Sequence, residues 1–187
     1  MQNTYQWRRC GTVKYYSISA SAAADAQAIS FRLSDLTNYT SFTDLFDQYR
    51  INSVTMKVRL ISPPEDATTV NTTFYPDFYV TVDHDDLTFP TGAEYMLQYA
   101  KMKQGVLKAD RWLTYTFHPS VNAQVYNGVS SVGYVVPNKP QWCDVAFADI
   151  PHYTLKWYCV VPGGLTTAYT IPYEVQFFYD ISFKNSR

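Results

Sequence analysis

The sequence predicts an all-β fold, an eight-stranded antiparallel jelly-roll sandwich with two short helical inserts. The first observation is an excess of aromatic residues, 17 Tyr, 11 Phe and 4 Trp, which fit a pleated, half-buried surface. The second is alternation of apolar and polar residues along most of the chain. The third is that only Asn127-Gly128 resembles a two-residue hairpin turn. Long connections favour a jelly roll over a simple meander, and 187 residues fit one domain, 1–187.

The first third of the chain predicts strands around one helix. Residues 12–19 and 29–33 alternate, and the small residues of 20–28 between them carry no apolar stripe, so we expect a loop or bulge interrupting one long strand. Residues 41–49 carry aromatic and leucine side chains at helical spacing, which predicts a short helix. That helix leads into an alternating strand over 54–60.

The rest of the chain predicts the remaining strands and a second helix. Glu94 follows Thr91 by three residues, the capping-box spacing, so a short helix is expected to run to about Tyr99. Alternation or bounding turn residues predict further strands at 78–82, 105–109, 111–118, 132–136, 153–161 and 173–183.

Composition excludes several classes of protein. The net charge of −1 is not that of a globally basic nucleic-acid binder. Cys10, Cys143 and Cys159 are widely separated, which predicts buried reduced thiols and neither a disulfide framework nor a zinc site. No apolar run is long enough to cross a bilayer, so membrane insertion is not expected.

An enzymatic role is not expected either. The three histidines, His84, His118 and His152, lie in no nucleophile motif, and no Gly-rich phosphate loop or His-Glu-x-x-His motif occurs. A carboxylate pair of the glycosidase kind stays open, but nothing in the sequence selects one. The sequence therefore predicts no catalytic residues.

Three segments together resemble a known family. Phe42–Val54, with the ending Phe-Asp-Gln-Tyr-Arg-Ile, Phe78–Asp86, and the terminal Tyr173–Arg187 are similar in order and spacing to capsid proteins of small circular Rep-encoding single-stranded DNA viruses, the circovirus-like group. The resemblance implies identical subunits that self-assemble into a small icosahedral T=1 shell around a circular single-stranded DNA genome. It also implies a location in the virion, assembly in the host nucleus or cytoplasm, and attachment to a host-cell receptor.

Basic residues are the candidates for nucleic-acid contact. The family usually carries a strongly basic arm before the first strand, and here that arm is apparently absent, because only two arginines precede the predicted first strand. Cations with interleaved aromatic rings can bind single strands through phosphate contact and base stacking, although a few solvated charges would look the same. The candidates are Trp7, Arg8, Arg9, Lys14, Lys184 and Arg187; Lys57 and Arg59 share a strand face and either join them or keep that face soluble.

An acidic cluster is the candidate metal site. Asp83, Asp85 and Asp86, with His84 between them, could supply carboxylate oxygens to Ca²⁺. The cluster lacks the glycine and distal glutamate of an EF-hand loop, and acidic loops are more often simply hydrated. No other cofactor is expected.

Two alternative functions share this fold class. A jelly-roll carbohydrate-binding module could use exposed Tyr and Trp to stack on sugars, and a lipocalin-like carrier is the third hypothesis. Self-assembly distinguishes the capsid function from these two alternatives, because a capsid subunit must present large apolar patches to several neighbours.

Overall fold

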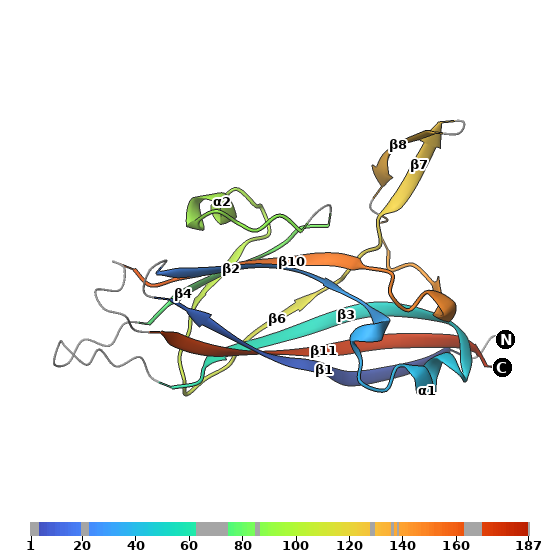
Figure 1. Ribbon diagram of the computed structural model, residues 1–187, viewed down its shortest axis with the longest axis horizontal. Coiled ribbons are helices and arrows are strands. Elements are labelled where there is room, and N and C mark those ends of the chain that lie inside the picture. Colours follow the sequence, from blue (N-terminus) through green and yellow to red (C-terminus); the bar gives the residue numbers. More distant parts are fainter. Residues whose placement is uncertain are drawn as a thin grey trace.

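The protein folds as a sandwich of two antiparallel sheets (Figure 1). The computed structural model describes residues 4–19, 23–62, 75–84, 87–127, 130–135, 137, 139–162 and 170–186; the side chains of 8–10, 123–127, 130–135 and 154 are outside this description. The first sheet has the order β1 (Thr4–Ile18), β11 (Ile171–Ser186), β3 (Phe46–Leu60) and β6 (Leu113–Phe117), and β9 (Cys143–Asp144) pairs with β3. The second has the order β2 (Ala24–Phe31), β10 (His152–Val160), β4 (Asp77–Val82) and β5 (Lys103–Val106).

The strand order confirms the predicted jelly roll. The chain passes from one sheet to the other between β1 and β2, β2 and β3, and β3 and β4, and again after β5, before β10 and after β10. Sequential strands are therefore rarely neighbours, as a Greek-key sandwich requires. A separate hairpin, β7 (Ala123–Asn127) with β8 (Ser130–Val135), projects from the sandwich on the same side as α2 (Ala93–Leu97) (Figure 1).

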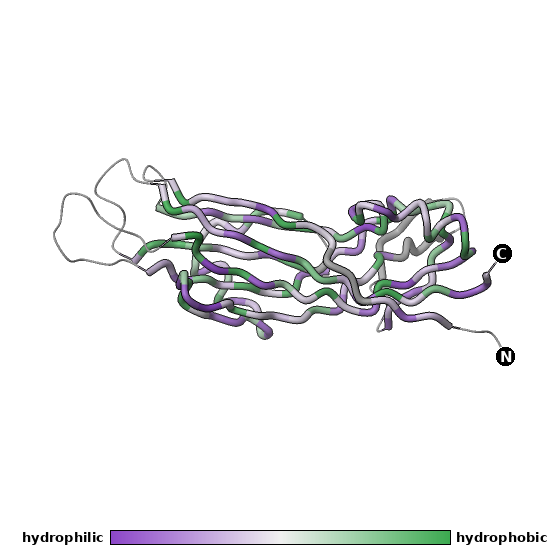
Figure 2. The backbone as a smooth tube through the Cα atoms, turned by 90° about the horizontal axis from the view of Figure 1, so that it is seen from below, coloured by the Kyte–Doolittle hydropathy of each residue, from purple (hydrophilic) through white to green (hydrophobic). Residues whose placement is uncertain are grey.

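The core lies between the sheets and is built by alternation. Tyr173, Val175 and Phe177 are each at most 1 % exposed, and the tube view shows apolar and polar residues alternating along the strands (Figure 2). From the opposite sheet, Trp157 donates its indole N–H to the Tyr173 hydroxyl at 3.0 Å. The buried indole therefore keeps a partner, and the predicted strands at 153–161 and 173–183 are confirmed.

The first connection differs from the prediction. Ala24–Phe31 is not the continuation of the first strand after a bulge but β2, an edge strand of the opposite sheet, paired with β10; residues 20–22 lie outside the described part. The first strand also starts earlier than expected, at Thr4, because β1 pairs with β11 from Thr4 opposite Lys184.

The predicted helix over 41–49 is largely wrong. Helix α1 covers only Thr40–Thr43, and β3 begins at Phe46. Phe46 and Tyr49 are both buried although three residues apart on β3. On the partner strand β11, Asn185 has a positive φ of 58° between Lys184 and Ser186, which pair with Gln48 and Phe46. A strand with a local irregularity can therefore show the spacing that predicts a helix.

The second helix forms but is shorter than predicted. Helix α2 ends at Leu97, and its N-cap is Gly92 with no side-chain cap, so the expected capping box of Thr91 and Glu94 is absent. Two short 3₁₀ helices, η1 (Leu33–Asp35) and η2 (Val145–Phe147), complete the elements. Strands β7 and β8 pair as a hairpin in which Asn127 is the last residue of β7, opposite Ser130, and the connection over 128–129 is outside the described residues.

Two further sequence predictions concern the cysteines and membrane-spanning segments. Cys143 and Cys159 are buried free thiols, and the side chain of Cys10 is outside the description. No helix among the described residues is long and apolar enough to span a membrane.

Candidate nucleic-acid interface

The N-terminal candidates lie within a strand rather than in an arm before it. In β1, Trp7 pairs with Ile181, Arg8 with Asp180 and Arg9 with Tyr179. The Trp7 ring packs edge-on against Phe42 of α1, with centroids 5.5 Å apart, at the margin of the core. Trp7 therefore does not lie with Lys184 on the outward face of the sheet. The side chains of Arg8 and Arg9 are outside the description.

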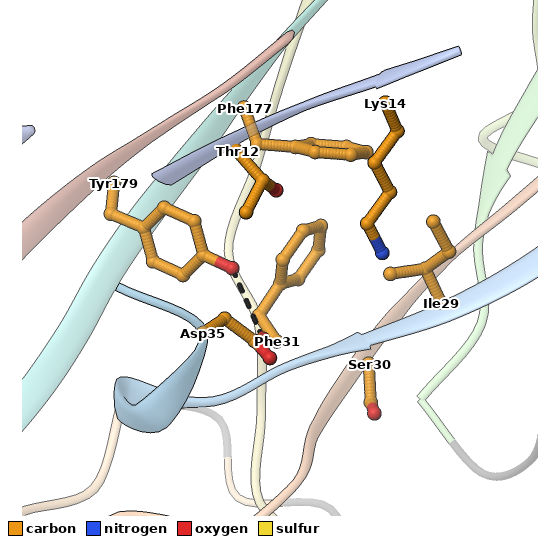
Figure 3. Close-up of a pocket in the computed structure, with 8 residues that line it drawn as sticks. All are labelled: Thr12, Lys14, Ile29, Ser30, Phe31, Asp35, Phe177 and Tyr179. Carbon is orange, nitrogen blue, oxygen red and sulfur yellow. Dashed lines mark hydrogen bonds between the residues drawn. The ribbon is translucent and has the colours of Figure 1, made fainter. Parts of the chain in front are cut away.

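Lys14 is also separated from the outward face. A register shift between Cys10 and Val13 places Lys14 opposite the core residue Val175. Its side chain lines a cavity of about 60 Å³ at the open edge between β1 and β2, where Tyr179 donates a 3.3 Å hydrogen bond to Asp35 (Figure 3). The cavity has room for about two water molecules. Arg187 is outside the described residues.

Four cations gather on the outward face of the first sheet. Arg50, Lys57 and Arg59 point outward from β3, since they alternate with the buried residues of that strand. Lys184 lies on the adjacent strand β11, whose core-facing neighbour Phe183 is buried. We call this surface, defined by Arg50, Lys57, Arg59 and Lys184, the basic face.

Each cation of the basic face lies over an aromatic ring. The Arg50 guanidinium is 4.6 Å and the Lys184 ammonium 4.4 Å from the centre of the same Trp142 ring. The other two follow the same pattern, Lys57 over Phe178 at 5.2 Å and Arg59 over Trp112 at 4.3 Å. Such contacts contribute about 0.5–1 kcal/mol each at exposed sites and hold long side chains in place.

The carboxylates on this face neutralise only part of its charge. Glu174 forms an ion pair with Arg59, 3.2 Å from Nη2 to Oε2. Asp180 accepts hydrogen bonds from Gln6 at 2.9 Å and Asn52 at 3.2 Å. Within the described chain, Arg50, Lys57 and Lys184 have no carboxylate at ion-pair distance. Cations beside aromatic rings can contact phosphates and stack on bases, which is the chemistry of single-strand binding.

The carboxylate of the candidate metal ligand Asp83 is bound by other side chains of the protein. Its carboxylate forms a buried ion pair with Lys156, 2.7 Å from Nζ to Oδ2, and accepts a 2.8 Å hydrogen bond from the Tyr99 hydroxyl. Burial, a hydrogen bond to Tyr95 and the nearby Asp83 raise the pKa of Tyr99, so this hydroxyl stays protonated and donates. Asp85 and Asp86 are outside the described residues, and no group of three or more His, Cys, Asp or Glu side chains in the described part could hold a metal ion.

Large apolar side chains are exposed at both ends of the sandwich and around α2. Tyr15 is 70 % exposed, Phe147 64 % and Leu97 59 %. A monomer exposes single apolar residues without consequence, but extended patches are typical of contact surfaces.

Comparison with known proteins decides the family. The sequence model of the circovirus capsid protein family matches residues 1–187. The chain belongs to the circovirus capsid protein family. It is therefore a structural protein of a virus particle, as the resemblance predicted.

Solved structures show that the fold is shared. The 60-mer of the BFDV capsid protein has a TM-score of 0.71 at 16% identity over 98% of this chain and 95% of that one. The decameric BFDV capsid protein has a TM-score of 0.62 at 17% identity, covering 98% and 100%. The shell protein of a nodavirus of the prawn Macrobrachium rosenbergii has a TM-score of 0.53 at 10% identity over 100% of this chain and 95% of that one. No curated protein sequence matches the chain.

For this capsid protein, sequence reasoning missed one of the four cations of the basic face, Arg50. Lys184 was a candidate for nucleic-acid contact, and Lys57 and Arg59 were visible as the polar partners of an alternating strand. Arg50 was hidden by the helix prediction, although it alternates with the apolar Tyr49 and Ile51. Trp112 and Trp142 lie outside the main strands, so nothing local in the sequence indicated which cations they meet.

Proposed function

We propose that copies of this chain close into a small icosahedral T=1 shell around circular single-stranded DNA, with the basic face toward the genome. Membership of the capsid family over residues 1–187 carries the proposal. The 60-mer described for the BFDV capsid protein, which shares the fold over 98% of this chain, supports a sixty-subunit shell. Assembly in the host nucleus or cytoplasm and attachment to a host receptor belong to the same proposal.

The charge distribution supports the orientation. Arg50, Lys57 and Lys184 lie on one sheet face without carboxylate partners in the described chain. Arg50 and Lys184 lie over the Trp142 ring, and Lys57 lies over Phe178. On the outward face of the second sheet, α2 packs over β4 and β10, and Lys156 is paired with Asp83. Each neutralised phosphate releases condensed counterions, so a cationic sheet face repeated sixty times favours enclosure of a polyanion.

Particle formation is the first test. Purified protein examined by size-exclusion chromatography and electron microscopy is expected to form spherical particles. A strict monomer at micromolar concentration across a range of salt would remove the shell proposal, and it would revive the carbohydrate-binding alternative, which a glycan array would then test.

Salt dependence tests the orientation. The double variant Arg50→Gln/Lys184→Gln should lower the affinity for single-stranded DNA and reduce the slope of log affinity against log salt by about 1.4, because about 0.7 is lost per phosphate contact. The control Lys101→Gln/Lys139→Gln removes the same charge elsewhere on the surface and should leave the slope unchanged. Equal slopes for the two variants would contradict the orientation.

A further inference from the structure

A second cationic site lies in a cleft away from the basic face. Two contiguous pockets, with volumes of about 400 and 560 Å³, share His84, Lys101 and His118. The cleft runs from the end of β4 and the start of β5 past the end of β6 to the segments that flank the β7–β8 hairpin. The remaining lining residues that matter here are Lys103, Lys139 and Phe117. This volume is in the range of small-molecule sites.

Both histidines are fixed by the same kind of hydrogen bond. The Nδ1 of His84 lies 3.1 Å from the Tyr153 carbonyl oxygen, and the Nδ1 of His118 lies 3.0 Å from the Asn52 carbonyl oxygen. A carbonyl can only accept, so Nδ1 carries the hydrogen in each ring. Nε2 is thus the nitrogen available to a ligand, and it becomes a donor when the ring is protonated.

The cleft carries positive charge that the described chain does not neutralise. Lys101, Lys103 and Lys139 are exposed, none of them forms an ion pair with a described residue, and no carboxylate is among the described lining residues. Of the aspartates that flank His84 in sequence, Asp83 is held by Lys156, and Asp85 and Asp86 lie outside the described residues. Three ammonium groups around a concave surface favour an anion.

The cleft differs from the basic face in its aromatic content. Apart from the imidazoles of His84 and His118, Phe117 is the aromatic ring among the described lining residues, and it is 4 % exposed. The Tyr115 ring, 6.0 Å from the Lys103 ammonium, is also buried, so neither of these two rings offers a surface on which a base could stack. On the basic face every cation lies over a ring. Stacking on exposed rings is a main source of single-strand affinity, so the cleft suits an anion without a nucleobase.

We propose that this cleft binds a phosphate or sulfate group carried by a non-aromatic molecule. The ammonium groups of Lys101, Lys103 and Lys139 supply charge and hydrogen-bond donors, and the imidazoles of His84 and His118 supply oriented Nε2 atoms. The site is independent of the basic face and of the direction in which the shell encloses its genome.

Calorimetric titration with inorganic pyrophosphate and with sulfate, at constant ionic strength, tests the proposal on purified full-length protein. Lys101→Gln/Lys139→Gln should weaken binding at least about tenfold, the effect of losing charge-assisted hydrogen bonds. Arg32→Gln/Arg111→Gln removes the same charge from exposed positions outside the cleft and the basic face and should bind as the unmodified protein does. His118→Asn keeps a donor near the Nδ1 position and loses Nε2, and it should weaken binding by a smaller factor.

Three outcomes would overturn the proposal. The first is that the unmodified protein binds neither anion at millimolar concentration. The second is that Lys101→Gln/Lys139→Gln binds them equally well while its thermal unfolding is unchanged. The third is that Lys101→Gln/Lys139→Gln loses affinity for oligo(dT) as strongly as Arg50→Gln/Lys184→Gln does, because the cleft would then be a nucleic-acid site. Particle formation by every variant would show that the shell proposal stands whatever the titrations give.

Discussion

The outward faces of the two sheets carry similar charged groups in different environments. On the first sheet, Arg50 and Lys184 are half-buried around the Trp142 ring and lack carboxylate partners in the described chain. On the second sheet, Lys156 is 1 % exposed beneath α2 and is paired with Asp83 at 2.7 Å. An ammonium group can be buried only with a partner, whereas an exposed one beside a ring keeps its charge for a ligand.

Helix α2, which covers the outward face of the second sheet, explains why Lys156 is buried. Helix α2 packs on β4 and β10, and Figure 1 shows it above this sheet. Tyr99, just after α2, reaches Asp83 and contacts the Tyr95 hydroxyl at 2.9 Å. Thr81, opposite Lys156 in register, is 1 % exposed and its hydroxyl has no partner. The covered face, in its described part, is therefore a polar layer that contains the Asp83–Lys156 ion pair, and the open face presents cations without described carboxylate partners.

The largest expected effect comes from breaking the buried pair. Lys156→Met should lower the free energy of unfolding by about 3–5 kcal/mol, because it leaves the Asp83 carboxylate buried without its cation. Lys184→Met on the open face should change it by less than about 1 kcal/mol. Urea unfolding of the unassembled subunit, followed by Trp fluorescence, measures both.

The double variant Lys156→Met/Asp83→Leu serves as the control for volume and hydrophobicity. Replacing both partners removes the unpaired charge, so much of the lost stability should return. Equal costs for Lys156→Met and Lys184→Met would show that the two faces do not differ as we argue.

A smaller effect is expected from the hydroxyl that anchors the segment after α2. Tyr99→Phe removes the 2.8 Å hydrogen bond to Asp83 and should cost about 1–2 kcal/mol of unfolding free energy. Tyr95→Phe, which leaves the bond to Asp83 in place, is the matched control and should cost less. Hydrogen exchange of the α2 amides should report the same order, and a reversed order would contradict the role given to Tyr99.

How well the sequence predicted each strand depends on how its side chains are buried. Residues 54–60 and 173–183 were predicted well because each strand has one buried face, so alternation records its orientation. Ala24–Ala28 was missed because β2 is an edge strand of half-buried small residues, held to β10 largely by backbone pairing that leaves no side-chain pattern.

The candidate sites were harder to predict for a different reason. The charge at 57 and 59 follows from alternation, but the rings that hold the cations come from segments far away in sequence, such as Trp142 over Arg50. The ion pair of Asp83 with Lys156 joins residues more than seventy positions apart. Such contacts follow from the topology, which the sequence pattern alone did not determine.

A still smaller effect is expected when the rings of the basic face are removed. Trp142→Leu should cost about 1 kcal/mol of stability, because two exposed cation–π contacts are lost while the charges remain. Affinity for single-stranded DNA should fall with little change in the salt slope, since stacking and not phosphate contact is removed. Phe147→Leu, at an exposed aromatic position outside the basic face, is the control. A changed slope would mean that Trp142 acts by placing Arg50 and Lys184 rather than by stacking.

The smallest effect is expected from calcium. The Ca²⁺ hypothesis for Asp83, Asp85 and Asp86 stays a prediction, but the Asp83 carboxylate already has Lys156 as its cation, and a second cation would have to compete with it. Chelation should therefore shift the thermal unfolding midpoint of the particles very little. Lys156→Met should be the more calcium-sensitive protein, because Asp83 has then lost the cation with which Ca²⁺ would compete. A large loss of particle stability on chelation of the unmodified protein, reversed by Ca²⁺ and abolished in Asp85→Asn/Asp86→Asn, would show that the acidic cluster binds metal beside an intact ion pair.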